Sequence, residues 1–332
     1  MKPVTLEPHA FFRRIPPLSD RLRDRYTATA DAIVLCHLGI PRLDRATWSL
    51  TVDGLVARAL TLRFDDLLKY PKATVTSIHQ CAGSPVKPDE PMRRICNLAW
   101  SGARLVDVLA DCQPAAAAKY VWSFGADYGA YSGVAVEAYV KDMPIARAAA
   151  DVLIAYEING APLPAEHGFP ARLFVPGFYG TNSVKWLTRI TLAESRADGP
   201  FTTRWYNDQV LDAHGRDAGR TAPVWAVAPE SMIVAPAPDA ALPAGTACEV
   251  WGWAWADGGV RALDVTCDDG TTWRPAQLEP ARGREWQRFS LGWTPRARGM
   301  VRLASRAESA GGGRQPEAGW RNAIHRVPVT IV

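Results

Sequence analysis

Short runs of alternating hydrophobic and polar residues fill the first two thirds of the chain, and this pattern favours strands over long helices. Four runs have the length and composition of strands: 48–54, 61–64, 120–124 and 134–136. Three segments have helical spacing or helix-start signals: 65–70, 104–110 and 144–149, the last with a proline in its first turn. Short helices mixed with short strands predict an α+β fold for this region.

The pattern changes after about Gly215, where Ala222-Pro223 opens a proline-rich link. Strand-like runs follow at 247–255 and 262–267, and the turn signal Asp268-Asp269-Gly270 closes the second run. Strand signals then recur about every 8 to 12 residues to the end of the chain. We therefore predict an all-β sandwich of immunoglobulin-like size in this part.

These patterns divide the chain into three parts. We predict an Arg-rich N-terminal arm over 1–30, an α+β domain over 31–218 and a β-sandwich over 222–332. A length of 332 residues fits two domains of ordinary size.

Three tryptophans, Trp251, Trp253 and Trp255, alternate with small residues in the predicted sandwich. A period of two places all three indoles on one face of a strand. Two interpretations stay open: core packing within the sandwich, or an interface.

The composition excludes several classes of protein. Hydrophobic residues make up 48% of the chain, and the net charge is only +4 with no basic tract, so we expect no nucleic-acid partner. No apolar run reaches the ~18 residues of a membrane span, so we expect no membrane partner. The pair Arg13-Arg14 is not followed by the apolar region of an export signal. Six cysteines without a CxxC pair suit a reducing compartment, and we expect a cytoplasmic location.

One cysteine follows a strand-like run directly. Cys81 comes after residues 74–78 and lies in a loop that contains Gly83. A thiolate is a soft metal ligand, but a single cysteine is also common as a small buried hydrophobe. The residues alone leave both roles open for Cys81.

Four motifs in order carry a family resemblance. They are His79-Gln80-Cys81-Ala82-Gly83, Trp100-Ser101-Gly102-Ala103-Arg104-Leu105, the stretch from Ala155 to Arg172, and Val175-Pro176-Gly177-Phe178-Tyr179-Gly180 to Leu187. Together they resemble the sulfite oxidase family of molybdenum enzymes. The C-terminal strings 269–273 and 322–327 resemble the dimerisation module of that family. The resemblance implies a molybdopterin-binding catalytic domain over 31–218, followed by an immunoglobulin-like dimerisation domain.

The resemblance implies one molybdenum–molybdopterin cofactor per chain, with Cys81 as the protein ligand of the metal. It implies that Tyr206 lies beside the metal-oxo group, so Cys81 and Tyr206 are the expected catalytic residues. Six further positions match the family's contacts to the pterin and its phosphate: His37, Asp127, His167, Arg172, Ser183 and Lys185. Considered without the family, Arg172 and Lys185 fit surface charges equally well, His167 and Asp127 fit ordinary turn or loop residues, and Tyr206 fits a half-buried interface tyrosine.

The chain departs from the family at positions that face the substrate anion. Leu35 stands where the family has an arginine, and Ser84-Pro85-Val86 replaces an Asn-Arg-Arg string. An arginine-bearing insertion before Asn322 is shortened to residues 317–321, and the sequence leaves open whether Arg321 reaches the site as a partial substitute. Each lost charge-assisted hydrogen bond costs about 1.5–3 kcal/mol, so sulfite is expected to be a poor substrate.

The resemblance therefore predicts an oxidoreductase that catalyses two-electron oxo transfer on a small oxyanion or an S- or N-oxide type of molecule. Electrons would pass to a separate carrier protein such as a cytochrome, and the chain would form a homodimer. Two alternatives stay open: reductive oxo transfer to an S-oxide, an N-oxide or nitrate, and a cofactor-binding homologue without catalytic activity.

Overall fold

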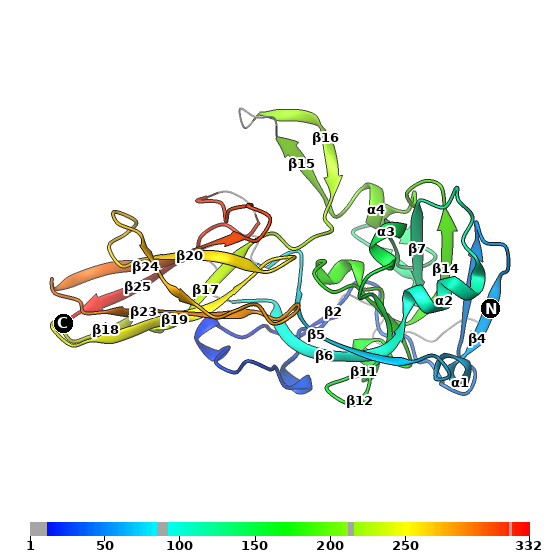
Figure 1. The fold of residues 1–332 in the computed structure, drawn as a ribbon, viewed down its shortest axis with the longest axis horizontal. Coiled ribbons are helices and arrows are strands. Elements are labelled where there is room, and N and C mark those ends of the chain that lie inside the picture. Colours follow the sequence, from blue (N-terminus) through cyan, green and yellow to red (C-terminus); the bar gives the residue numbers. More distant parts are fainter. Residues whose placement is uncertain (1–11, 85–91, 212–215, 319–320) are drawn as a thin grey trace. The chain divides into compact units, whose positions relative to one another are not determined.

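The computed structural model describes residues 12–84, 92–211, 216–318 and 321–332. The described chain consists mostly of strands with a few short helices, as Figure 1 shows. It divides into two compact units. Unit 1 comprises residues 34–75 and 99–225 and the described residues before Ile15, and unit 2 comprises the described residues of 15–33, 76–98 and 226–332.

The two units interleave along the sequence. Strands β5 (Lys72–Gln80) and β6 (Ile95–Arg104) each contribute residues to both units. As a result, residues 76–98, including Cys81, group with the C-terminal unit. The boundaries after residues 30 and 218 stay a prediction.

Unit 1 is built on two main sheets. The first has the strand order β10 (Val140–Pro144), β7 (Tyr120–Gly125), β14 (Leu187–Ala193), β3 (Ser49–Gly54) and β4 (Leu60–Arg63). The second has the order β12 (Ala161–Pro162), β11 (Leu153–Ile158), β6 and β5, with β13 (Arg172–Phe174) also paired to β11. Leu50, Val52 and Ile190 project from the first sheet into a buried apolar core, as the period of two in their strands requires.

The smaller elements of unit 1 lie between and beside these sheets. Its helices are α1 (Phe64–Leu67), α2 (Leu105–Cys112), α3 (Ile145–Ala148) and α4 (Pro200–Thr203). Its strand pairs are β1 (Phe12–Arg13) with β2 (Leu35–Cys36), β8 (Gly129–Tyr131) with β9 (Val134–Val136), and β15 (Asn207–Leu211) with β16 (Asp217–Pro223). The helices expected over 65–70, 104–110 and 144–149 are present with shifted ends. None of the described helices combines the length and apolarity needed to cross a bilayer.

The C-terminal part of unit 2 is a sandwich of two sheets. One has the order β17 (Glu230–Ala235), β19 (Cys248–Trp255), β23 (Gln287–Trp293) and β22 (Gln277–Leu278). The other has the order β18 (Ala240–Leu242), β25 (Arg326–Ile331), β24 (Gly299–Ser309), β20 (Val260–Thr266) and β21 (Arg274–Pro275). The predicted β-sandwich is confirmed. Its core contains Val250 and Ala254 of β19 together with Val265 and Leu303.

The tryptophans of β19 lie on the face opposite this core. The indole N–H of Trp253 donates to the carbonyl of Leu22 at 2.7 Å, and the indole N–H of Trp286 donates to the carbonyl of Arg25 at 2.8 Å. The Trp253 and Trp286 rings stack at 4.9 Å, and the Arg25 guanidinium lies 5.2 Å from the centre of the Trp253 ring. The indoles therefore share one face, as predicted, and that face is covered by an N-terminal segment of the same chain.

Trp253 tests how much this tryptophan face contributes to stability. Trp253→Ala removes a side chain that is 3% exposed, and we expect a loss of about 3–5 kcal/mol in the free energy of unfolding, measured by denaturant titration. Trp251→Ala on the same strand is the matched control; its half-buried ring predicts a clearly smaller loss. Equal losses for the two variants would contradict the assignment of Trp253 as the anchor of this face.

Candidate functional site

The Cys81 loop begins where β5 ends and lies in unit 2. The backbone N–H of Cys81 donates to the carbonyl of Arg94 at 2.9 Å, and the N–H of Ser84 donates to the carbonyl of Cys81 at 3.1 Å. The N–H of Gly83 points at the Cys81 sulfur at 3.4 Å. These bonds form a tight turn around Cys81, a residue that is half-buried.

Two arginines act on this thiol. Burial raises the pKa of Cys81, while the Gly83 N–H and the positive charges of Arg94 and Arg321 oppose that rise. Arg94 is fixed by a 2.8 Å hydrogen bond from its guanidinium to the carbonyl of Gly83. The sequence left open whether Arg321 reaches Cys81, and the structure brings its charge to bear on the sulfur. Nothing in the sequence pattern singled out Arg94.

Pro85 and Val86, two positions where the family arginines are missing, lie outside the described residues. Leu35 is half-buried in β2 of unit 1. The substrate-facing positions are therefore described only in part.

Lys185 is the centre of a second cluster, which lies in unit 1. Its ammonium donates to the carbonyls of Leu35 at 3.0 Å and Glu166 at 2.9 Å, and lies 2.9 Å from the sulfur of Cys36. It also lies 4.4 Å from the centre of the Trp186 ring. Burial lowers the pKa of Lys185. A lysine so enclosed is not a solvated surface charge.

Arg172, His167 and Ser183 are buried beside Lys185. The Arg172 guanidinium donates to the carbonyl of His167 at 3.0 Å and to the carbonyl of Ser183 at 2.8 Å. The hydroxyl of Ser183 accepts a hydrogen bond from the N–H of Val175 at 3.0 Å. The charge of Arg172 also contributes to lowering the pKa of Lys185. The structure thus brings Arg172, Ser183, His167 and Lys185 into one cluster.

Asp127 belongs to the same cluster. Burial raises its pKa to about 7, and the nearby charge of Lys185 opposes that rise. A carboxyl so shifted is only partly ionised near pH 7, so it offsets part of the positive charge of Lys185 and Arg172, whose hydrogen bonds run to backbone carbonyls and the Cys36 sulfur. Buried cations with this donor set suit an anionic group such as a phosphate.

His37 lies next to Tyr206, also in unit 1. The imidazole Nε2 is 2.5 Å from the Tyr206 hydroxyl. Burial, followed by the charges of Lys185 and Lys141, lowers the pKa of His37 to about 3. The ring is therefore neutral at physiological pH, and its Nε2 can accept a hydrogen bond from the phenol hydroxyl. Tyr206 has a left-handed backbone with φ 61°, which is uncommon for a bulky residue.

Lys141 is a residue of this cluster that the sequence did not reveal. Its ammonium donates to the carbonyl of Phe201 at 2.8 Å and lies 5.0 Å from the centre of the Tyr206 ring. Burial lowers the pKa of Lys141 to about 7; Asp142 opposes this shift and Arg196 adds to it. In the sequence, Lys141 is recognisable only as a lysine within the strand Val140–Pro144. Its role could not be predicted, because Phe201 and Tyr206 are 60 or more positions away.

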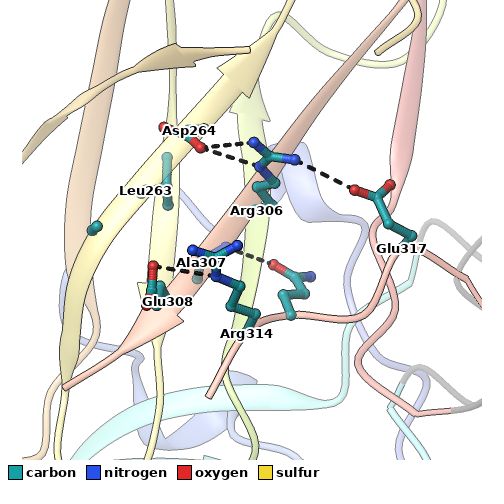
Figure 2. Close-up of a pocket in the computed structure, with 9 residues that line it drawn as sticks. Leu263, Asp264, Arg306, Ala307, Glu308, Arg314 and Glu317 are labelled. Carbon is teal, nitrogen blue, oxygen red and sulfur yellow. Dashed lines mark hydrogen bonds and ion pairs between the residues drawn. The ribbon is translucent and has the colours of Figure 1, made fainter. Parts of the chain in front are cut away.

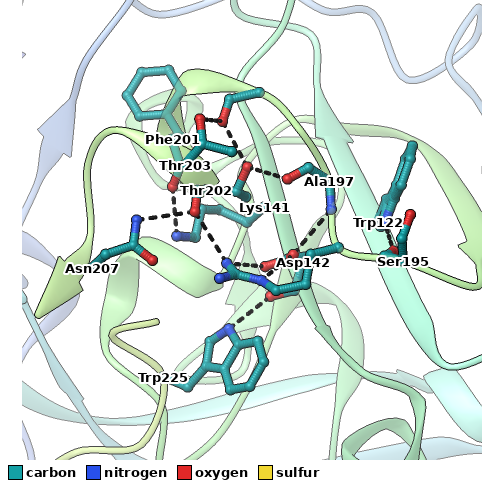
Figure 3. Close-up of polar contacts among 12 residues, drawn as sticks. Trp122, Lys141, Asp142, Ser195, Ala197, Phe201, Thr202, Thr203, Asn207 and Trp225 are labelled. Carbon is teal, nitrogen blue, oxygen red and sulfur yellow. Dashed lines mark hydrogen bonds and ion pairs between the residues drawn. The ribbon is translucent and has the colours of Figure 1, made fainter. Parts of the chain in front are cut away.

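An ion pair between Asp142 and Arg196 supports the segment that leads to Tyr206, and Figure 3 shows the contacts around Asp142. The Asp142 carboxylate accepts two hydrogen bonds from Arg196, at 2.8 and 3.0 Å, and one from the N–H of Ala197 at 3.1 Å. Arg196 also donates to the carbonyl of Thr202 at 3.2 Å. Asp142 therefore holds the backbone N–H of Ala197, and Lys141 holds the carbonyl of Phe201, in the segment that precedes Tyr206.

A cavity of about 320 Å³ in unit 2 is lined by charged residues that pair with one another (Figure 2). Arg306 bonds to Asp264 at 3.0 Å and to Glu317 at 3.5 Å, and Arg314 lies 3.5 Å from Glu308. Because these cations already have carboxylate partners, we do not place the functional site there.

Two domain families match the chain. The family described as "Oxidoreductase molybdopterin binding domain" matches residues 37–201, and the family described as "Mo-co oxidoreductase dimerisation domain" matches residues 222–302. The first match includes Cys81, Asp127 and Lys185. The second covers most of the predicted sandwich.

Individual proteins with known descriptions are also similar. The chain is 32% identical to mitochondrial sulfite oxidase of Rattus norvegicus, over 89% of this chain and 60% of the relative. It is 32% identical to an NAD(P)H nitrate reductase of Hordeum vulgare, over 76% of this chain and 32% of the relative. The crystal structure of the sulfane dehydrogenase SoxCD from Paracoccus pantotrophus superposes with a TM-score of 0.81 at 26% identity, covering 100% of this chain and 90% of the other. The chain spans about 60% of the length of the sulfite oxidases it matches.

The lowered pKa of Lys141 predicts a pH dependence of stability. Between about pH 7 and 10 the unfolded lysine holds a proton that the folded one has lost, so stability should rise with pH through this window. Lys141→Met removes this contribution. Between pH 8 and 10, the slope of its free energy of unfolding against pH should be lower than that of the wild type by about 1 kcal/mol per pH unit. Lys119→Met, at an exposed lysine paired with Glu194, is the control and should keep the wild-type slope. Parallel profiles for the wild type and Lys141→Met would refute the assigned burial.

Proposed function

The chain belongs to the sulfite oxidase family of molybdopterin-binding oxidoreductases, and from this we propose that it catalyses two-electron oxo transfer to a reduced sulfur atom. The observation that supports the proposal most directly is the Cys81 thiol, held on a tight turn inside the matched domain and under the influence of two guanidinium groups. The cofactor of this family is a molybdenum–molybdopterin.

The donor chemistry of this chain fits such a cofactor. Cys81 would supply the soft thiolate ligand of the metal. Lys185, Arg172, Ser183 and His167 would hold the phosphate and the pterin edge, with Asp127 as a further pterin contact. The resemblance implies these assignments, and cations whose hydrogen bonds run to neutral acceptors support them. When bound, the molybdenum supplies the two-electron redox step and the oxo transfer.

Tyr206 would form a hydrogen bond with the reacting oxygen, and His37 would orient the Tyr206 hydroxyl. In the proposed reaction, a sulfur atom and water give a sulfur–oxygen bond, two protons and two electrons. The Tyr206 hydroxyl would donate a hydrogen bond to the neutral Nε2 of His37 at 2.5 Å, which orients the phenol oxygen so that it can accept a hydrogen bond from the reacting water; both protons leave to solvent. Lys141 and Lys185 both disfavour an imidazolium at His37 and so keep it an acceptor. His37 was predicted as a pterin contact; its bond to Tyr206 adds a role in orienting that phenol.

The charges near Cys81 favour a substrate with one anionic group. Leu35 replaces a family arginine, whereas Arg94 and Arg321 place two positive charges near the sulfur. A terminal sulfur atom on a singly anionic or carrier-bound molecule fits this balance better than the sulfite dianion. The similarity to a sulfane dehydrogenase supports the same class of substrate.

Reduction of nitrate is the second candidate. Nitrate reductases of Hordeum vulgare are among the similar proteins, at 32% and 27% identity. Nitrate carries a single negative charge, which the two arginines could also bind. The assay below separates the two directions.

The remaining features of the function follow the family. We propose a homodimer through the sandwich, because the dimerisation family matches it. We also propose that the electrons leave one at a time to a separate cytochrome-type carrier. A cytoplasmic location stays a prediction.

The metal ligand assignment is tested by Cys81→Ala. The wild-type protein from a cofactor-competent host should contain about one molybdenum per chain, and it should oxidise sulfane or thiosulfonate compounds with an artificial electron acceptor. Cys81→Ala should lose this activity and keep its fold by circular dichroism, because the thiolate is removed and little else. Cys248→Ala, a partly exposed cysteine of the same unit, is the control. Retained turnover in Cys81→Ala contradicts the ligand role, turnover of nitrate with a reduced dye favours the second candidate, and loaded protein inert to all substrates favours a non-catalytic homologue.

The substrate charge is tested by Arg94→Gln. Loss of one guanidinium should raise KM for an anionic sulfur substrate by about tenfold, corresponding to one charge-assisted interaction of at least 1.4 kcal/mol. The KM for an uncharged S-oxide or thiol substrate should change little, and Arg288→Gln at an exposed pair serves as the control. An unchanged KM for the anion would remove Arg94 from substrate recognition.

A further inference from the structure

The residue before Cys81 is bound to the β-sandwich. The amide nitrogen of Gln80 donates to the carbonyl of Ser84 at 2.6 Å and to the carboxylate of Glu230 on β17. The amide oxygen of Gln80 accepts the indole N–H of Trp255 on β19 at 2.9 Å. Gln80, Glu230 and Trp255 are each 1% exposed. A side chain amide has two hydrogens and one oxygen, so these three bonds fix its orientation.

The other end of the loop is held as firmly. The hydroxyl of Ser84 accepts the N–H of Arg94 at 2.5 Å, and the carbonyl of Arg94 accepts the N–H of Cys81 at 2.9 Å. Both ends of the four-residue loop from Cys81 to Ser84 are therefore bound to neighbours in unit 2: buried Gln80 and half-buried Arg94. The sulfur between them has little freedom to change direction.

Glu230 is an unusual residue for this place. Burial raises its pKa to about 7, while Arg93 and the Gln80 amide oppose the rise. The Arg93 guanidinium lies 4.0 Å from the carboxylate, and both side chains are almost fully buried. An acidic group in such surroundings costs free energy, and an apolar residue would pack there at lower cost. A role in positioning the Gln80 side chain accounts for its presence.

We infer that Glu230 is a positioning residue for the metal-binding thiolate, acting through Gln80, so that the domain matched to dimerisation also sets the direction of Cys81. The inference rests on the proposed function for its consequence in catalysis, but its geometric part concerns the chain alone. Glu230 acts on the loop only through its contact with Gln80.

Site-resolved alkylation tests the geometric part in full-length protein prepared without cofactor. Glu230→Ala should raise the rate at which iodoacetamide modifies Cys81 by about tenfold, because one charge-assisted bond to the loop is lost. Glu230→Gln, which can still accept a hydrogen bond from Gln80, should restore the rate to within about twofold of wild type. Glu249→Ala, an exposed carboxylate of β19 paired with Arg288, is the control. Mass spectrometry of the Cys81 and Cys96 peptides provides the readout.

The pattern of modification distinguishes positioning from general loosening. Buried Cys96 should stay unmodified in all variants. An unchanged Cys81 rate in Glu230→Ala, or a parallel rise at Cys96, would overturn the inference. Should Glu230→Ala fail to fold, Trp255→Phe removes only the indole donor and should raise the Cys81 rate in the same direction; no rise there also overturns it.

A second readout uses the loaded enzyme. The electron paramagnetic resonance spectrum of the metal should shift in Trp255→Phe and not in Glu249→Ala, because only the first alters the direction of the thiolate. An unshifted spectrum in Trp255→Phe would contradict the positioning role. The proposed function fails separately, when Cys81→Ala retains activity, whatever the alkylation rates show.

Discussion

The cost of removing charge from water governs both candidate clusters. Burial drives the pKa of Lys141 and Asp127 toward 7 and the pKa of His37 to about 3. Such shifts persist only where the surrounding fold holds the groups in place. Backbone carbonyls of short helices, turns and loops supply that support, because they bind the ammonium and guanidinium groups without neutralising them. The remaining positive charge is what suits this chain to an anionic cofactor.

The same cost explains why neutral hydrogen-bonding groups stand beside the charged ones. The Gln80 amide connects the buried Glu230 carboxylate to the Cys81 loop, and the Trp255 indole holds that amide; neither group adds charge. In unit 1 the Tyr206 hydroxyl and a neutral His37 form a comparable pair. In each cluster a buried charged residue, Glu230 or Lys141, lies next to a neutral hydrogen-bonding group, Gln80 or Tyr206. That neutral group is the one adjacent to the proposed reaction centre.

Local patterns predicted much of the fold. Alternation identified β3, β7, β19 and β20. In β3 and β7 one face is buried, whereas β19 buries both faces, with core residues on one and Trp253 and Trp255 on the other. Helix ends were less well placed, since α1 and α3 are single turns whose limits depend on tertiary contacts. The period of two placed the tryptophans on one face correctly. It could not say which face, because the N-terminal segment that covers them is more than 200 residues away in sequence.

Only those candidate site residues that lie within a family motif could be predicted from the sequence. Cys81, Lys185 and Tyr206 stand in recognisable strings, whereas Arg94, Lys141 and Glu230 gain their roles from partners distant in sequence. The division into units was also hidden, because β5 and β6 pass from one to the other. That interleaving affects biosynthesis. The loop around Cys81 emerges from the ribosome some 150 residues before Glu230 and 175 before Trp255, so its anchors do not exist until most of the chain has been made. The loop around Cys81 can therefore take its final, anchored form only after the C-terminal domain has been translated.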